Sequence, residues 1–171
     1  MEQYALYLVM KKEVLKLSNN FKCSFNDMDF NKPNVVGIYV RGGNTPDSRE
    51  LSTGKYYNYT ARVQFIISGN NSKESLMEIM GLASELRTAL ETSSNQLIVL
   101  SDEEIKWVNG KIVYDPKNEL VGNDIEVVLC SVGLMGEVSF HGKNQMGLPK
   151  YSLNIYVNYY CKVKEEKQNG N

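Results

Sequence analysis

The sequence predicts an α+β domain: a twisted, mostly antiparallel sheet with one long helix and an N-terminal helix packed on it. Three patterns indicate this class. A helical apolar stripe runs through residues 72–92, a second helical pattern covers residues 4–17, and strict apolar–polar alternation marks residues 56–68 and 151–161. The 171 residues suit one domain with a packed core. We expect that domain to span residues 1–163, with residues 164–171 forming a charged, flexible tail.

The first element expected is an amphipathic helix over residues 4–17. Lysines and one glutamate occupy one side of it, and the apolar side chains that recur at helical spacing are Tyr7, Met10, Val14 and Leu17. The Asn- and Asp-rich residues 18–33 then predict a loop. Three aromatic side chains could anchor that loop to the core: Phe21, Phe25 and Phe30.

Two strands are expected next. Residues 34–41 are rich in β-branched and aromatic side chains and stop at a pair of glycines, which predicts a strand that ends in a turn. Residues 44–55 are polar and predict an exposed loop. Residues 56–68 alternate, so one face of this strand should be buried, with Ala61, Val63, Phe65 and Ile67 on it.

The helical stripe of residues 72–92 is the strongest signal in the chain. Asn71 and Glu74 have the spacing of a capping box that would begin this helix. The side chains expected to face the sheet are Leu76, Ile79, Met80, Ala83, Leu86 and Leu90.

Shorter β-rich segments follow the helix. Residues 97–100 form an apolar run, and residues 106–114 place Asn109-Gly110 between two β-prone arms, which predicts a tight hairpin. Residues 124–134 predict another strand, and glycines punctuate the chain from there to Pro149.

The last strand has the clearest alternation. The side chains of residues 151–161 that should face the core are those at odd positions, so Tyr156 and Tyr160 should lie on the opposite face. Tyrosines on a face outside the core are typical of protein interfaces. A helix packed over that face, for which the N-terminal helix is a candidate, would explain them equally well.

Composition argues against most chemical functions. The net charge of −1 gives no overall field for holding nucleic acid, and a single histidine with three scattered cysteines leaves no zinc site. The common phosphate-loop, dinucleotide, zinc-protease and hydrolase motifs are absent. We therefore predict no enzyme, catalytic residue, metal or cofactor. His141 is expected to be a loop residue and the acidic residues 102–104 a solvated turn or helix start.

The order of apolar and basic residues at the N-terminus is wrong for a signal peptide. In addition, no apolar run is long enough to cross a bilayer. We expect synthesis in the cytoplasm, no membrane contact and unpaired, buried thiols at the three cysteines.

The closing segment of the chain resembles a known pattern. A strand ending in Arg41-Gly42-Gly43, a further strand, one long helix and the segment HGKNQMGLPKYSLNIYVNYY follow one another. This arrangement is similar to the tail terminator, or minor capsid, proteins of long-tailed bacteriophages. The matching positions of the closing segment are Gly142, Asn144, Gly147, Pro149, Tyr151, Ser152, Leu153 and Asn154. The resemblance covers roughly residues 34–92 and 138–160.

The resemblance implies a structural virion protein at the head-proximal end of the tail. Such a subunit forms a homo-oligomeric ring, usually a hexamer, that caps the tail tube protein and meets the head–tail connector protein. DNA could pass through its lumen without sequence-specific contacts. A tail tube or head-completion protein is the nearest alternative, and a small enzyme is the alternative from another class. The residues expected at interfaces are Arg41, Arg49, Lys143, Asn144, Tyr156 and Tyr160.

Overall fold

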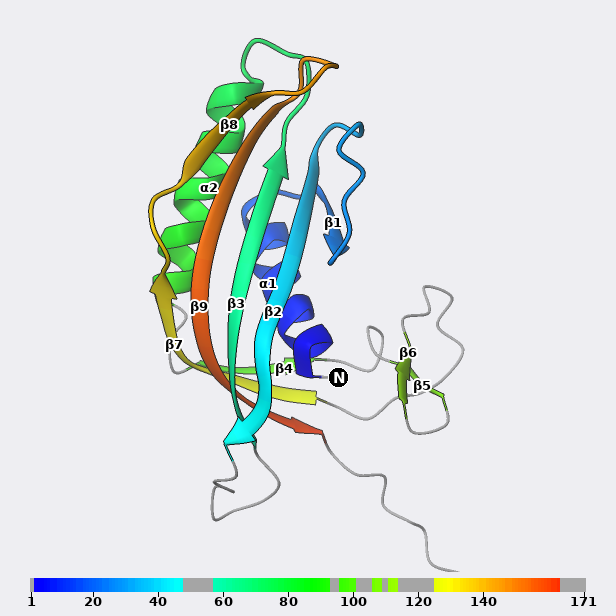
Figure 1. Ribbon diagram of the computed structural model, residues 1–171, viewed down its shortest axis with the longest axis vertical. Helices are drawn as coiled ribbons and strands as arrows, with labels where there is room; N and C mark the ends of the chain where they lie inside the picture. Colours follow the sequence, from blue (N-terminus) through cyan, green and yellow to red (C-terminus); the bar gives the residue numbers. More distant parts are fainter. Residues whose placement is uncertain are drawn as a thin grey trace, which may run out of the picture.

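A strongly curved sheet organises the structure, a computed structural model that describes residues 2–47, 57–92, 96–100, 106–108, 111–113 and 125–163 (Figure 1). Its elements are, in chain order, α1 (Glu2–Leu17), β1 (Lys22–Phe25), β2 (Val35–Asp47), β3 (Tyr57–Ser68), α2 (Ser75–Thr92), β4 (Gln96–Leu100), β5 (Lys106–Val108), β6 (Lys111–Val113), β7 (Ile125–Leu134), β8 (Ser139–Lys143) and β9 (Pro149–Val163).

Seven of these strands form one sheet in the order β1-β2-β3-β9-β7-β4, with β8 paired to β9 outside this path. Among the strand pairs that this sheet forms within the described residues, only β1–β2 is parallel, and the others are antiparallel. The predicted α+β class with a mostly antiparallel sheet is therefore confirmed. The strands β5 and β6 form a separate two-stranded sheet, which confirms the expected hairpin, although residues 109 and 110 lie outside the described residues.

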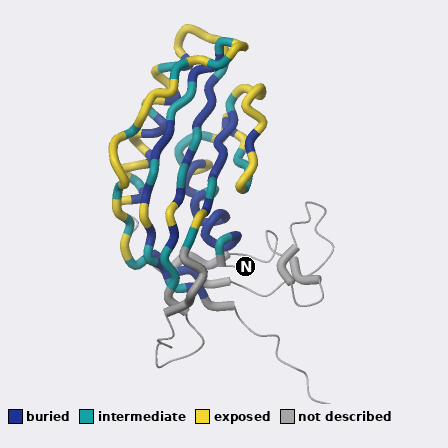
Figure 2. Tube along the Cα trace, in the orientation of Figure 1, coloured by how far each residue is buried: buried dark blue, intermediate teal, exposed yellow. Residues whose placement is uncertain are grey.

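Both helices lie on one face of the sheet. In Figure 1 the strands β2, β3 and β9 pass in front of α1 and α2, and Figure 2 shows buried and exposed positions alternating along these strands. The register explains the alternation, because Val40 lies opposite Val63 and Val63 lies opposite Ile155, all three buried. The same helix-covered face carries Ala61, Phe65, Ile67, Leu153, Val157 and Tyr159.

Helix α2 packs most of its predicted stripe on the sheet, with Leu76 only half-buried. Ile79, Ala83, Leu86 and Leu90 are fully buried, whereas Met80 is exposed and Leu82 is buried in its place. The predicted capping box is wrong, since the helix begins at Ser75 rather than Ser72. A different contact lies at the beginning of the helix: the backbone N–H of Asn70 donates a hydrogen bond to the hydroxyl oxygen of Ser75 at 2.7 Å.

Helix α1 is not amphipathic over its first half, contrary to the prediction. Every residue from Tyr4 to Met10 is buried, because α1 contacts β2 and α2 and is also reached by β1, β4 and β7. A helix that is surrounded in this way is apolar all round. The polar side begins only at Lys11.

The predicted loop over residues 18–33 contains strand β1, which the Asn-rich composition concealed. Its Phe25 packs against Tyr4 and Tyr7, with ring centroids 5.4 and 5.0 Å apart. Phe21 is also buried, while Phe30 stays exposed, so two of the three expected anchors are confirmed. Residues 139–143 likewise form strand β8 within the glycine-punctuated stretch.

Strand β2 continues to Asp47 instead of ending at the glycine pair, with a register shift between Gly43 and Asp47. The residues 44–47 of the predicted loop therefore belong to a strand, and residues 48–56 lie outside the described residues. The glycine at 42 serves a close approach rather than a turn. A Cβ there would stand 2.9 Å from the Thr60 carbonyl oxygen.

Two glycine substitutions should have opposite effects on stability. Gly42→Ala should destabilise the fold by about 1–3 kcal/mol, because backbone must move to admit the methyl group. Gly81→Ala should stabilise it by about 0.5–1 kcal/mol, because Gly81 lies inside α2 with nothing within 4 Å of an added Cβ. Urea unfolding of both variants measures this, and equal effects would contradict the packing at Gly42.

Candidate assembly surface

The sheet has a second face that neither helix covers. We call it the open face and define it by the side chains of β2, β3 and β9 that point away from the helices: Tyr39, Arg41, Thr60, Arg62, Gln64, Asn154, Tyr156, Asn158 and Tyr160. All of them are exposed or half-buried. The helix layer that could have explained Tyr156 and Tyr160 therefore packs on the other face.

Hydrogen bonds between side chains join three strands across the open face. The Thr60 hydroxyl donates to Asn158 Oδ1 at 2.9 Å, and Asn158 Nδ2 donates to the Ser131 hydroxyl oxygen at 3.0 Å. These bonds connect β3, β9 and β7. Because these side chains are short and bonded to one another, they rise little above the backbone of the sheet. A partner could therefore approach the strands closely at this point.

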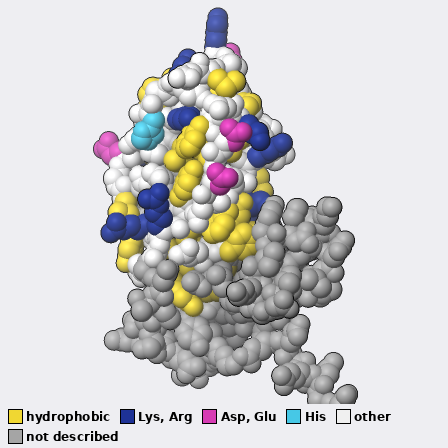
Figure 3. Space-filling model, turned by 45° about the vertical axis from the view of Figure 1, so that its right-hand side comes forward, with side chains coloured by type: hydrophobic (Ala, Val, Ile, Leu, Met, Phe, Trp, Pro, Cys, Tyr) yellow, Lys and Arg dark blue, Asp and Glu magenta, His cyan; other side chains and the backbone are white. Residues whose placement is uncertain are grey.

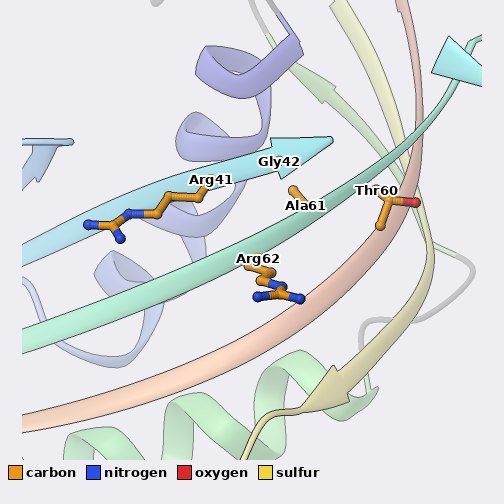
Figure 4. A pocket seen from close by; sticks show the side chains of 5 residues that line it. All are labelled: Arg41, Gly42, Thr60, Ala61 and Arg62. Carbon is orange, nitrogen blue, oxygen red and sulfur yellow. The ribbon is translucent and has the colours of Figure 1, made fainter. Parts of the chain in front are cut away.

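Arg41 and Arg62 stand directly opposite each other on β2 and β3. Figure 4 shows both side chains on the side of the sheet away from the helices. They line a shallow hollow of about 410 Å³ together with Gly42, Thr60 and Ala61. Like charges placed directly across an antiparallel pair destabilise it. Among the described residues, neither guanidinium has a hydrogen bond or an ion pair.

Tyrosines border the arginines. Tyr156 lies opposite Arg62 on β9 and is 38% exposed, and Tyr160 lies four residues further along the same face of the strand. On the other side, burial and then Asp27 raise the pKa of the Tyr39 hydroxyl, while Arg41 lowers it. Tyr39 therefore stays neutral and can act as a hydrogen-bond donor. Cationic groups beside amphipathic rings are the composition that interface centres favour.

The structure gathers only part of the predicted interface set. Arg41, Tyr156 and Tyr160 share the open face, whereas Lys143 and Asn144 lie near Pro149, at the other end of β9. Lys143 is exposed there. Arg49 lies outside the described residues.

Asn144 organises the turn that leads into β9. Its Oδ1 accepts hydrogen bonds from the Met146 and Leu148 amides at 2.9 Å, and its Nδ2 donates to the Phe30 carbonyl oxygen at 2.7 Å. With all of its amide atoms engaged inside the chain, Asn144 has a structural role in this turn.

Sequence reasoning left Arg62 and Tyr39 out of the site. The alternation did place Arg62 on the polar face of its strand, together with Thr60 and Gln64. Its position opposite Arg41 follows only from the β2–β3 register. The residues between the two strands predicted an exposed loop, and a loop prediction does not fix a register, so the sequence offered no means of pairing the two arginines.

The remaining predicted chemistry-bearing residues lie apart. His141 Nε2 is 2.6 Å from the Ser152 hydroxyl oxygen on β9, which orients the ring at the sheet edge. The acidic residues 102–104 are not described. Within the described ranges, no three His, Cys, Asp or Glu side chains gather as a metal site, and neither helix is long and apolar enough to span a membrane.

Comparisons with known proteins add little. No protein family matches the sequence, and no curated protein is similar to it. A solved structure with 11% sequence identity aligns over 96% of this chain and 94% of that chain, with a TM-score of 0.36. At that TM-score the likeness has no bearing on function.

Replacing one of the facing arginines should stabilise the isolated subunit. In Arg62→Gln we expect a gain of about 0.2–0.5 kcal/mol at low salt, because the like-charge contact with Arg41 disappears and solvent screens much of it. Thermal melts of dilute protein measure the change, which should shrink at 1 M salt. The control Arg87→Gln loses an exposed pair with Glu91 and should show no gain. A stability loss in Arg62→Gln would contradict the absence of a partner.

The cysteine thiols should react slowly. None of the three forms a disulfide, and burial raises the pKa of Cys23 from 9.0 to about 11, with Lys11 opposing the shift. At pH 8 its thiolate fraction should therefore be roughly 100-fold below that of an ordinary thiol. Iodoacetamide labelling of Cys23 should be slow at pH 8 and accelerate up to about pH 11, whereas labelling in urea should follow an ordinary thiol. A native rate that levels off near pH 9 would contradict this.

Proposed function

We propose that this chain is a structural virion protein of the tail terminator kind, a subunit that assembles into a ring. The observation that carries the proposal is the open face. One side of the sheet carries the apolar core under two helices, while the other presents Arg41 opposite Arg62 beside partly exposed tyrosines. The repulsion between these two cations lowers the stability of the isolated subunit. An anionic partner that covers them would neutralise this repulsion and so favour binding.

Ring formation requires two different complementary patches on every subunit. The curved sheet supplies a stiff support for one patch, because hydrogen-bonded ladders hold β2, β3 and β9 in register along most of their lengths. Heterologous contacts of this kind close into a ring when the rotation between neighbours divides a full turn, and otherwise form a filament.

The closing segment, which resembles that of tail terminators, forms an ordered turn, and this supports the proposal. Gly142 and Gly147 adopt φ values of +80° and +78°, which side chains rarely permit, and Asn144 bonds across the turn between them. Pro149 then begins strand β9. The segment thus forms the turn that delivers β9 between β3 and β7.

In this proposed role, the ring would sit on the last ring of the tail tube protein and present its other side to the head–tail connector. It would stop tube growth and work through shape and charge, with no bond made or broken. DNA would pass through the lumen without sequence readout. The subunit would be made in the host cytoplasm and function at the head-proximal end of the tail.

Purified protein should form discrete rings, with six copies as the expected number, either alone or on tail tubes. Native mass spectrometry gives the copy number, and negative-stain images separate closed rings from filaments. Long filaments of the protein alone would favour a tail tube protein instead. A strict monomer that also fails to bind tube ends would contradict the proposal.

A further inference from the structure

The outer face of helix α2 is a second surface with a composition opposite to that of the open face. We define this surface, the α2 outer face, by the residues of the helix that are exposed or half-buried: Leu76, Met77, Glu78, Met80, Gly81, Ser84, Glu85, Arg87, Thr88, Ala89, Glu91 and Thr92. Its basic residue, Arg87, is paired with Glu91. The α2 outer face carries Glu78 and Glu85, seven residues apart and thus on the same side of the helix, about 10 Å from one another along its axis. Glu74 stands just before the helix.

These carboxylates have no cationic neighbour in the part of the chain that the structure describes. Glu78 and Glu85 make no ion pair there, in contrast to Glu91, which lies 3.8 Å from Arg87. The α2 outer face thus offers unpaired anions, just as Arg41 and Arg62 on the open face offer unpaired cations.

The middle of the α2 outer face suits close packing. Gly81, Ser84 and Thr88 follow one another along the helix and place small side chains beside the glutamates, while the exposed Arg87 and Glu91 pair with each other. Met77, 64% exposed, is the most exposed large apolar side chain described. A flexible apolar side chain at that position can fill gaps against tyrosine rings.

The two surfaces point in opposite directions. Helix α2 lies on the core side of the sheet, and its outer face looks away from it, whereas the open face looks out from the other side (Figure 1). Figure 3, which views the molecule obliquely, shows basic side chains on the left, above the grey atoms, and others on the right beside acidic side chains and at the top. One subunit can therefore offer its anionic surface to one neighbour and its cationic surface to another.

We propose that the α2 outer face of one copy docks on the open face of the next, with Glu78 and Glu85 meeting Arg41 and Arg62. The occupant of the open face is thus a second copy of this chain. Arginine and carboxylate form short, charge-assisted and often bidentate hydrogen bonds, which fix register as well as add affinity. Met77 then lies towards the rings of the tyrosines. This inference rests on the proposed assembly and identifies the two surfaces that make it.

Paired charge reversals test this contact. The variant R41E/R62E presents two acidic surfaces, and the variant E78K/E85K presents two basic ones. For each variant alone, the protein concentration at which half of the chains assemble should rise on the order of 100-fold. At concentrations where the unaltered chain assembles, each variant alone should therefore stay monomeric. An equimolar mixture should assemble again, because every acidic open face then meets a lysine-bearing helix and every basic open face meets a glutamate-bearing one.

The mixture has a further diagnostic property. Its rings must alternate the two variants, so only an even number of copies can close without a mismatched contact. Native mass spectrometry should therefore find equal numbers of the two variants in each ring. Random incorporation would overturn the proposal.

The control reverses two exposed charges outside both surfaces, Lys32 in the loop before β2 and Glu137 just before β8, in the variant K32E/E137K, and should assemble like the unaltered chain. Circular dichroism and thermal melts check that every variant is folded. If R41E/R62E does not fold, R41Q/R62Q replaces it and should also remain monomeric.

Three results would overturn the contact. In the first, the unaltered chain forms rings and both reversals leave them intact, which removes this contact while the ring function stands. In the second, the control variant loses assembly while the reversals do not. In the third, the mixture stays monomeric and a double-stranded DNA oligonucleotide binds the unaltered chain but not R41E/R62E, which makes the open face a phosphate site. A chain that is monomeric in every form would instead contradict the ring function itself.

Discussion

The structure depends on the two-residue period of its three central strands. Because side chains along a strand alternate between faces, the apolar residues of β2, β3 and β9 all reach one side, and both helices must pack there to remove them from water. The same period sends arginine, tyrosine and asparagine to the other side. The pattern that places apolar side chains in the core therefore also places polar side chains on the open face. A shift of one residue in the register of a strand would move its apolar side chains to the open face and its polar side chains into the core.

This division separates stability from assembly in the molecule. Residues that hold the fold, such as Phe65 and Ile155, are fully buried under the helices, while residues proposed to meet a partner contribute nothing to the core. Arg41 and Arg62 weaken the pair of strands that bears them. A local loss of stability is common at residues that serve binding. Here the many backbone hydrogen bonds between β2 and β3 keep the two strands paired despite this loss.

The sequence predicted long, periodic elements well. Alternation identified β3 and β9 with the correct buried faces. The helical stripe located α2, although Leu76 is half-buried and Leu82 is buried in place of Met80. It failed where tertiary contacts override local preference. Strand β1 is held by parallel pairing with β2, and the first half of α1 is buried all round because five elements contact this helix. Of the site, Arg41, Tyr156 and Tyr160 were predicted, but Arg62 was not, because its position opposite Arg41 depends on a register that no local pattern encodes.

The place of β9 in the sheet has a consequence for how the chain folds. Its partners β3 and β7 do not pair with each other, so the sheet is divided until β9 enters between them. Ser68, at the end of β3, meets Lys150 only after the whole intervening segment has been synthesised. Contacts so distant in sequence make folding slow. Before that moment the growing chain lacks one of the three strands that form the open face, so the surface proposed to meet a partner is incomplete until synthesis is nearly finished.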